Sequence, residues 1–400
     1  MKFVVSGALL IAALAFGGSD TTNLPADWQF GRSLELPDAK SLALGGVSAA
    51  IGSPFGFLAN PALAATRYDR FNAPALSGAE LRPSVGLTGN LGTSTEQRTR
   101  MTYDSYNNAV GELAIADNTA FSPTAGPIAV QLPLGAFGVG LGVRPARDYT
   151  YHFRQEIRDD FYQLLRVSEQ DVSGQVNQAG AAIAYDLAGL IGLGAEFNYS
   201  FGERDLDSTK NDSLSTIHHT RLSGLGLGAG LLFHPGNAVR IGLSYTPRIA
   251  ALSNALTKKG DSSAAAFDDP SRIILGFNYF AAGPVPTGIY LQAGCAAWRE
   301  LDTLMLNSII DLRAGVEHQL LSNIALRYGF GLLPSPLDPT TQSGLVSLGV
   351  GLETDLAHID VGGSMQRRMF TNGRLLPNQA LDMRVYQTGW QMAISISRGF

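Results

Sequence analysis

The chain has 400 residues, a formal net charge of −5 and 16% charged residues, whereas ordinary globular chains carry about 25%. The negative net charge gives no support for a basic, nucleic-acid-binding surface. The single cysteine, Cys295, excludes an intramolecular disulfide framework. The length fits two or three soluble domains or one large barrel, and the 46 glycines favour the barrel. We interpret Cys295 as a small apolar filler on a lipid-facing row, with a catalytic thiol as the alternative.

Residues 1–18 have the pattern of a signal peptide. Lys2 precedes an apolar run from Phe3 to Phe16, and Ala13-Leu14-Ala15 offers a cleavage site between small residues. The run is shorter than the roughly 20 residues that span a bilayer. A lipoprotein anchor is excluded because no cysteine lies near this site. We therefore expect an exported protein whose mature chain starts between Phe16 and Ser19.

Residues 19–82 lack sustained alternation of apolar and polar positions. They contain the pair Gly45-Gly46, which lets the backbone pass close to other structure, and the sequence Asn60-Pro61-Ala62. Proline fixes its own φ and restricts the residue before it, so Asn60-Pro61 predicts a tight turn. A surface loop and a packed segment both fit this spacing.

From residue 83 onward, apolar residues recur at every second position, which predicts β-strands with one apolar face. In 190–201, for example, Ile191, Leu193 and Phe197 oppose Gly192, Gly194 and Glu196. Glycine inside a strand weakens it in water. On the inner wall of a crowded barrel, glycine instead makes room for a plug or a ligand.

The connections between these segments alternate in length. Short turns are expected near 134–136, 187–189, 234–237, 281–287, 320–322 and 356–358, and long polar segments near 93–126, 145–175, 202–221, 247–271, 298–307, 333–342 and 371–384. Outer-membrane barrels show this asymmetry, with short periplasmic turns and long extracellular loops. The count predicts an all-β fold, a transmembrane antiparallel β-barrel of about 14 strands over 83–400. A β-sandwich is the alternative, although it rarely runs to 300 residues.

The final segment, Val385 to Phe400, reads as the closing strand. Trp390, Ile394, Ile396 and Phe400 point one way, and polar or small residues point the other. An exposed apolar strand would be an aggregation hazard in water, but a barrel in lipid requires one. Trp390 is expected in an interfacial girdle together with Trp298, Tyr245 and Tyr279. The terminal Phe400 resembles the C-terminal signal that outer-membrane barrels present to the barrel-assembly machinery.

Charged residues with inward parity gather late in the chain. Carboxylates beside arginines would form ion-pair ladders across the lumen, which hold the barrel and its plug together. The alternative is a recognition site for the headgroup of an amphiphilic ligand. The residues of this predicted ladder are Asp311, Arg313, Glu317, Arg327, Glu353, Asp355, Asp360 and Arg368.

The sequence does not favour an enzyme. A hydrolytic serine needs a histidine oriented by a third group, and no G-x-S-x-G signature occurs. Adjacent His218 and His219 are interpreted as part of a solvated loop, because they could hold a metal only with help from elsewhere. We therefore expect no cofactor and no metal site.

The N-terminal motifs resemble those of a known family. Leu44-Gly45-Gly46-Val47 followed by Asn60-Pro61-Ala62-Leu63-Ala64, after a signal peptide and before a long β region, resembles the FadL/TodX outer-membrane transporters of hydrophobic compounds, and the related PorV-type barrels. The resemblance implies that residues 19–82 form a hatch inside a barrel of 14 strands. Where the family often has an acidic pair, this chain has Ile51-Gly52-Ser53-Pro54.

The resemblance also implies a function. We expect an integral outer-membrane protein that takes up hydrophobic or amphipathic small molecules such as long-chain fatty acids, with Gly45, Gly46, Asn60, Pro61 and Ala62 in the hatch. In this family, ligand is thought to leave sideways through a gap in the wall. One alternative is a PorV-like component that docks or shuttles secreted proteins, and another is a purely structural barrel. The expected partners are outer-membrane lipid, the barrel-assembly machinery, a hydrophobic ligand and secretion-system proteins.

Overall fold

The structure is a computed structural model that describes residues 31–34, 38–65, 83–158, 163–210, 214–236, 238–257, 262–301, 306–371 and 383–400. The predicted signal peptide, residues 1–18, lies outside these described residues, as do parts of the predicted hatch at 19–30 and 66–82. Among the described residues, no helix combines the length and the apolar character needed to cross a membrane.

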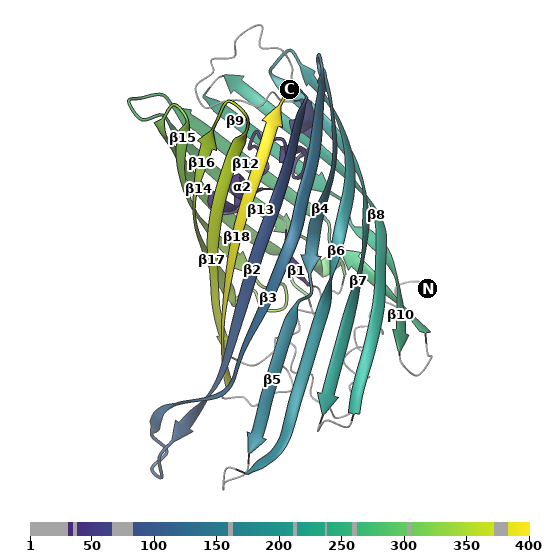
Figure 1. Ribbon diagram of the computed structural model, residues 1–400, viewed down its shortest axis with the longest axis vertical. Helices are drawn as coiled ribbons and strands as arrows, with labels where there is room; N and C mark the ends of the chain where they lie inside the picture. Colours follow the sequence, from purple (N-terminus) through teal and green to yellow (C-terminus); the bar gives the residue numbers. More distant parts are fainter. Residues whose placement is uncertain are drawn as a thin grey trace.

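A single antiparallel sheet forms the wall of the barrel (Figure 1). Its strands are β2 (Ser84–Tyr103), β3 (Ala109–Leu134), β4 (Phe137–Asp148), β5 (Tyr151–Arg158), β6 (Leu164–Leu187), β7 (Ile191–Lys210), β8 (Leu214–Gly236), β9 (Val239–Thr246), β10 (Ile249–Thr257), β11 (Ser262–Asp269), β12 (Arg272–Ala281), β13 (Thr287–Ala296), β14 (Ile309–Leu321), β15 (Ile324–Pro334), β16 (Gln342–Glu353), β17 (His358–Thr371) and β18 (Met383–Gly399).

Three strands of the wall are interrupted, and each is made of two consecutive elements: β4 with β5, β9 with β10, and β11 with β12. The two halves of each share a neighbour: β4 and β5 both pair with β6, and β9 and β10 both pair with β8, while β11 pairs with β10 and β12 pairs with β9. The described wall therefore has 14 strands. It closes where β18 pairs with β2, for example at Ile396 and Leu87. The predicted closed barrel and its strand number are confirmed.

An apolar band covers the outside of the barrel. Ile396 and Leu87 are about half exposed, and apolar side chains recur at alternate positions on the neighbouring strands. Trp390, Tyr245 and Tyr279 are likewise exposed, as the girdle prediction requires. Cys295 is exposed and lies between Ile273 and Ile310 on adjacent strands, which is the expected lipid-facing row. A surface of this kind is stable only where lipid tails cover it.

The two ends of the barrel differ, as Figure 1 shows. The predicted short turns occur between consecutive strands at the end where the C-terminus lies, which we call the short-turn end. At the opposite, extended end, four segments predicted as long loops, 93–126, 145–175, 202–221 and 247–271, are mostly strand instead. The predictions of loops there were wrong. Strands that leave the lipid carry polar residues on both faces, so their alternation disappears although their pairing continues.

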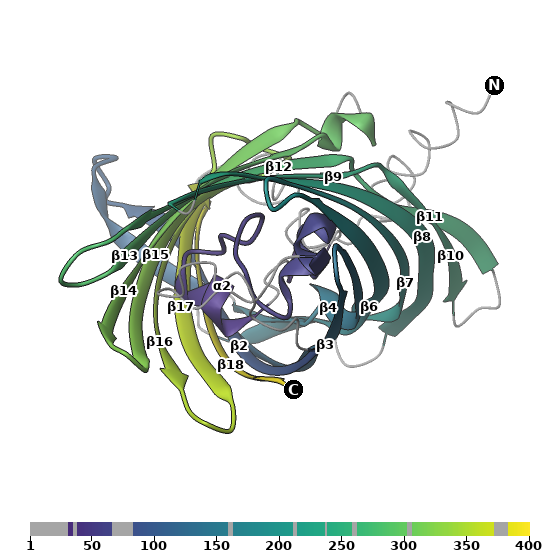
Figure 2. The same ribbon diagram turned by 90° about the horizontal axis from the view of Figure 1, so that it is seen from above.

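Residues 38–65, called the inner segment below, lie inside the barrel (Figure 2). They form α2 (Ala39–Ala43) and the short 3₁₀ helices η2 (Gly56–Leu58) and η3 (Pro61–Ala65), and most of their side chains are buried. The Asp38 side chain caps α2 by accepting a hydrogen bond from the backbone N–H of Ser41 at 2.7 Å.

Inward-facing glycines give the inner segment its space. A Cβ atom at Gly194 would lie 2.3 Å from the backbone nitrogen of Ala62, and one at Gly138 would lie 2.0 Å from the carbonyl oxygen of Ala64. Neither distance is compatible with a side chain. The glycine-rich inner faces of β4 and β7 therefore let the two backbones approach directly.

Polar side chains of the wall bind the backbone of the inner segment. Gln131 donates to the carbonyl oxygens of Leu63 and Ala64 at 3.0 and 2.9 Å, and the Gln292 Oε1 accepts from Ser48 and Ala49 at 2.8 and 3.1 Å. Burying backbone groups without partners is costly, so these amides stabilise an irregular segment inside the barrel. Asn278, Ser347, Ser395 and Arg313 make further hydrogen bonds of this kind.

The wall has one interruption next to the N-terminal residues. In the described chain, the ladder between β3 and β4 stops at the pair of Ile128 and Val143. Further along, Asn118 on β3 accepts a hydrogen bond from the Arg154 N–H on β5 at 2.8 Å. We call the stretch between these two links the window. Strand β1 (Arg32–Ser33) lies at the window and pairs with Asp148 and Arg147 of β4.

Candidate functional site

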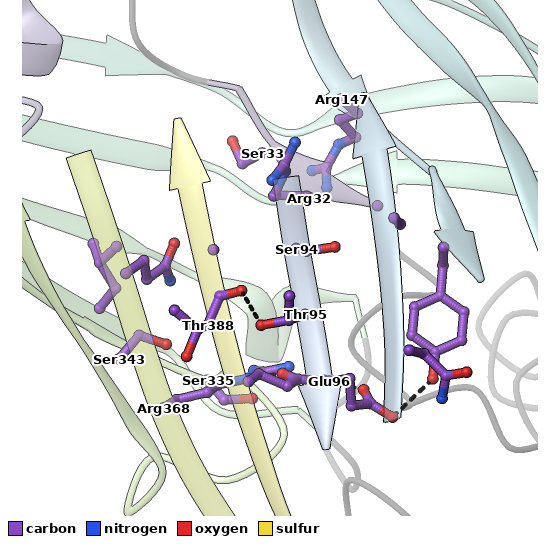
Figure 3. A pocket seen from close by; sticks show the side chains of 18 of the residues that line it. Arg32, Ser33, Ser94, Thr95, Glu96, Arg147, Ser335, Ser343, Arg368 and Thr388 are labelled. Carbon is purple, nitrogen blue, oxygen red and sulfur yellow. Dashed lines mark hydrogen bonds between the residues drawn. The ribbon is translucent and has the colours of Figure 1, made fainter. Parts of the chain in front are cut away.

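A pocket of about 230 Å³ lies inside the barrel beyond the inner segment, toward the extended end (Figure 3). Its place follows from β18: Gln387, Thr388 and Gly389 line the pocket, whereas Ser395 bonds to the inner segment six residues further on. At about 3.4 Å per residue, the pocket therefore lies roughly 20 Å along β18 from the point where that strand contacts the inner segment.

Two buried apolar clusters flank this pocket. Tyr151 belongs to one of them, together with Tyr149 and Phe153 at the start of β5, and Trp298 belongs to the other. Both Tyr151 and Trp298 line the pocket. Trp298 is 7% exposed, so its prediction as a girdle residue was wrong. It lies on η4 (Trp298–Glu300), a helical turn in the connection after β13, where the alternation of the strand no longer fixes the side-chain direction.

Three arginines supply positive charge around the pocket: Arg32, Arg147 and Arg368. Figure 3 shows Arg32 and Arg147 together at one end and Arg368 near Glu96 and Ser335 at the other. The Arg147 guanidinium lies 5.8 Å from the centre of the Trp298 ring, and Arg147 forms an ion pair with Asp269. The pocket thus combines apolar walls with cations, which suits a molecule that has an apolar body and a polar or anionic end.

Arg32 stands between the pocket and the window. Its Nη2 donates to the Asp148 Oδ2 at 2.7 Å and to the Ser122 Oγ at 2.8 Å. Asp148 and Ser122 in turn line an open depression of about 590 Å³ on the other side of this contact. The depression also includes the exposed Phe121 and residues of β6, β7 and β8. One guanidinium group therefore bridges the two edges of the window.

The predicted hatch residues all lie in the inner segment. Gly45 and Gly46 adopt positive φ angles of 75° and 84°, and Gly45 packs against the backbone of β14 and β15. Asn60 is buried and donates to the carbonyl oxygens of Ala49 and Leu231 at 2.8 and 3.2 Å. Its own side-chain oxygen accepts from the Ala62 N–H at 3.1 Å, which forms the turn expected of Asn60-Pro61.

The structure divides the predicted charge ladder into separate groups. Glu317, Arg327 and Asp360 form one buried network, because Arg327 bonds both carboxylates. Glu353 joins it through His358, which lies 2.8 Å from Glu353 and 3.0 Å from Asp360.

The remaining members of the predicted ladder lie elsewhere. Asp311 and Arg313 form a second pair at 2.9 Å, and Arg313 donates to the Gly46 carbonyl oxygen at 3.0 Å. Arg368 bonds Gln387 at the pocket, away from both groups. Asp355 is exposed in the turn between β16 and β17, so its prediction as a lumen residue was wrong. The alternation of inward and outward side chains holds only within a strand, so it does not predict the direction of a side chain in a turn.

At the C-terminus, Trp390 lies on the outer face of β18, and Phe400 is exposed. The Phe400 ring lies 5.4 Å from the Arg398 guanidinium, and its N–H donates to the Pro83 carbonyl oxygen at 2.8 Å. The closing strand thus places its last aromatic side chain at the short-turn end of the β2–β18 seam.

Sequence reasoning missed several residues. Arg32 follows Gly31 in a stretch without a motif. Lys40 lies 3.5 Å from Glu317 and links α2 to the buried charge network, and His358 was assigned to a turn although it begins β17. Lys40 carried a usable signal, because a lone lysine in a segment that is otherwise apolar and small requires a carboxylate partner when it is buried.

The barrel fold is shared with known structures. A FadL homologue from Pseudomonas aeruginosa has a TM-score of 0.66 at 13% identity, over 92% of this chain and 100% of that one. The chain has the FadL/TodX fold. The Pseudomonas putida toluene transporter TodX has a TM-score of 0.61 and the Ralstonia pickettii toluene transporter TbuX one of 0.59, each at 14% identity, covering 92% of this chain and 99% of theirs.

At the level of sequence, residues 89–267 match the model of the BamG family. This region runs from β2 to β11 and includes both edges of the window. No curated protein sequence matches the chain. The FadL/TodX likeness therefore rests on the three-dimensional arrangement, with sequence identity too low to carry residue roles across.

Proposed function

We propose that the protein conducts hydrophobic or amphipathic small molecules across the outer membrane and releases them sideways through the window. The observation that carries this proposal is that Arg32 lines the internal amphipathic pocket and also bonds Ser122 and Asp148, which line the open depression at the window. The FadL/TodX fold supports the same function, because the solved TodX and TbuX structures are of toluene transporters.

The pocket indicates which ligands fit. Trp298, Leu333 and Pro336 offer apolar contact, and Arg147 and Arg368 lie at opposite ends. A long-chain fatty acid combines an alkyl chain with a carboxylate that an arginine binds by two hydrogen bonds. An aromatic hydrocarbon would use the apolar walls alone. We propose the fatty acid as the preferred class.

In this mechanism the inner segment is the hatch that blocks the barrel at the short-turn end. Its backbone hydrogen bonds to Gln131 and Gln292 hold it in place, and the buried ion pairs of Arg327 brace the wall beside it. A ligand in the pocket therefore meets a firm barrier along the barrel axis. Displacement of β1 and Arg32 toward the pocket interior would open a lateral route into the lipid.

The experiment is uptake of radiolabelled oleate and toluene by cells with and without the protein. Cells that lack it should take up one or both compounds more slowly, and expression of the intact chain should restore the rate. Parental uptake of both compounds by the deletion strain, at limiting external concentration, would reject the proposal.

A second candidate is a docking function for proteins, and the match to the BamG model favours it. The strand extensions at the extended end give a broad polar surface beyond the lipid band. In this role the barrel would act beside the barrel-assembly machinery, or beside secreted proteins in a PorV-like manner. Affinity purification of the tagged barrel after cross-linking tests it. If no other protein co-purifies with the barrel and solute uptake is normal, the docking function is rejected and the transport function is retained.

A further inference from the structure

A group of metal-ligating side chains lies on the outer face of the strand extensions, at the level of the pocket: one of them belongs to His152, which follows the buried Tyr151 and is itself among the pocket-lining residues. Tyr199 and Phe201, whose rings stack 5.9 Å apart, are the last exposed aromatics along β7. Asp207 follows six residues later and lies opposite Asp171 of β6. Six residues of strand span roughly 20 Å, so this level lies beyond the apolar band.

Strand pairing brings three donors together at this level. His152 on β5 is the cross-strand partner of Asp171 on β6, and Glu169 precedes Asp171 by two residues and therefore shares its face. The donor atoms of His152, Glu169 and Asp171 all lie within 4.8 Å of one another. The inward neighbours Phe153 and Gln170 are buried, which fixes the outward direction of the three donors.

A fourth carboxylate extends the group across the next strand. Asp207 on β7 lies directly opposite Asp171 and is half-buried, and its Oδ1 is enclosed with no hydrogen-bond partner among the side chains that the structure describes. An unpaired buried carboxylate oxygen is costly, and a cation beside it removes that cost. Asp207 is therefore an independent indication that positive charge belongs at this place.

Two described cations near these carboxylates have partners of their own. Arg154, which lies opposite Glu169, donates to Glu156 at 3.1 Å. His219 on β8 bonds Asp205 and so belongs to a separate pair. His152 itself hydrogen-bonds Asp171 through its Nδ1. The carboxylates of Glu169, Asp171 and Asp207 thus lie on one face beside the imidazole of His152.

We propose that His152, Glu169 and Asp171 bind a divalent transition-metal ion such as Zn²⁺, with Asp207 beside it. One imidazole and carboxylate oxygens at this spacing suit Zn²⁺, whereas Ca²⁺ and Mg²⁺ prefer ligand sets made only of oxygen. The ion would replace the hydrogen bond between His152 and Asp171. It would also clamp β5 to β6, and β5 is the strand whose other edge borders the window.

The test uses the full-length barrel in detergent, stripped with a chelator that is then removed. Calorimetric titration with ZnCl₂ should show one site per chain. His152→Ala and Asp171→Asn should each weaken binding at least about tenfold, because each removes a ligand. His219→Ala is the matched control, since it removes the imidazole of a neighbouring histidine–aspartate pair, and it should leave the affinity unchanged. Heat-modifiable electrophoretic mobility checks that each variant is folded.

A spectroscopic readout complements the titration. Co²⁺ should give visible absorption bands of a nitrogen- and oxygen-ligated ion, and His152→Ala should abolish them. Absence of saturable Zn²⁺ binding by the intact chain would overturn the proposal. So would equal affinity in the intact chain and in a variant with both His152→Ala and Asp171→Asn, or Ca²⁺ binding tighter than Zn²⁺.

Discussion

Arg32 and Asp148 are cross-strand partners in the β1–β4 pair, and their side chains meet at 2.7 Å across the edge of the window. The same guanidinium bonds Ser122 on the other edge. A two-residue strand contributes few backbone hydrogen bonds, so this side-chain contact is a large part of what keeps β1 in place. Arg32, which lines the pocket and borders the window, is therefore held by a short and weakly anchored strand.

Replacing Arg32 should open the window. In Arg32→Ala, no side chain bridges Ser122 and Asp148, so we expect faster uptake of toluene, which does not need the cation. Arg299→Ala is the control, because Arg299 is exposed on η4. Liposomes containing each variant, loaded with a toluene-quenched dye, measure the rate. Equal rates for the two variants would show that Arg32 is no barrier.

Adding a single methyl group to the wall should disturb the inner segment. In Gly194→Ala, the new Cβ would lie 2.3 Å from the Ala62 nitrogen, whereas at Gly344 nothing lies within 4 Å. Overpacking of this kind costs about 1–3 kcal/mol. We expect Gly194→Ala to lower the free energy of unfolding in urea by this amount and to raise single-channel conductance. Gly344→Ala should do neither, and identical behaviour of the two variants would contradict the placement of the inner segment.

The buried network around Arg327 should be sensitive to the loss of one partner. Among the described residues, Arg327→Met leaves the buried Glu317 and Asp360 with only Lys40 and His358 as basic neighbours and without the guanidinium that joins them, which costs about 3–5 kcal/mol. Neutralising both carboxylates in the same variant, by Glu317→Gln and Asp360→Asn, should recover much of this loss. Urea unfolding in lipid followed by tryptophan fluorescence measures both effects. A similar loss in Asp355→Asn, a change in an exposed turn, would mean that the assay reports something other than the network.

Phe400 should matter for assembly rather than for the stability of the folded barrel. Its side chain is 64% exposed and has one described ring contact, with Arg398, so little burial is lost on truncation. Phe400→Ala should lower the amount of folded barrel in the outer membrane while leaving the unfolding free energy of the purified protein within about 0.5 kcal/mol. Trp390→Ala, which removes a girdle ring from the same strand, is the comparison. Normal assembly of Phe400→Ala would reject the predicted signal.

The architecture could be predicted because lipid imposes a strict rule on each strand. The outer face of residues such as Leu87 and Ile396 must be apolar, so alternation marks every membrane-crossing segment. The rule ends where the strand leaves the lipid. Glu96 and Arg98 are consecutive inward residues of β2, yet the predicted loop 93–126 begins before them, because the outward neighbours there are polar as well.

The site was predictable only in part. Asn60-Pro61 identified the turn, and the glycines of β7 indicated that something packs against the wall. The amides of Gln131 and Gln292, by contrast, look like any polar inward residues until the inner segment is placed beside them. Arg32 and Asp148 are 116 residues apart, and no local pattern marks a contact that only the barrel's closure creates.

A reversible lock on β1 tests the central claim most directly. Ser33 and Arg147 are directly opposite in the β1–β4 pair, close enough for a disulfide between Ser33→Cys and Arg147→Cys in a Cys295→Ala background. This lock keeps Arg32 and Asp148 intact. We predict that oxidised cells take up oleate no faster than cells without the protein, and that dithiothreitol restores uptake to the level of the Arg147→Cys single variant. Uptake by the oxidised double variant at the rate of that single variant would contradict release through the window.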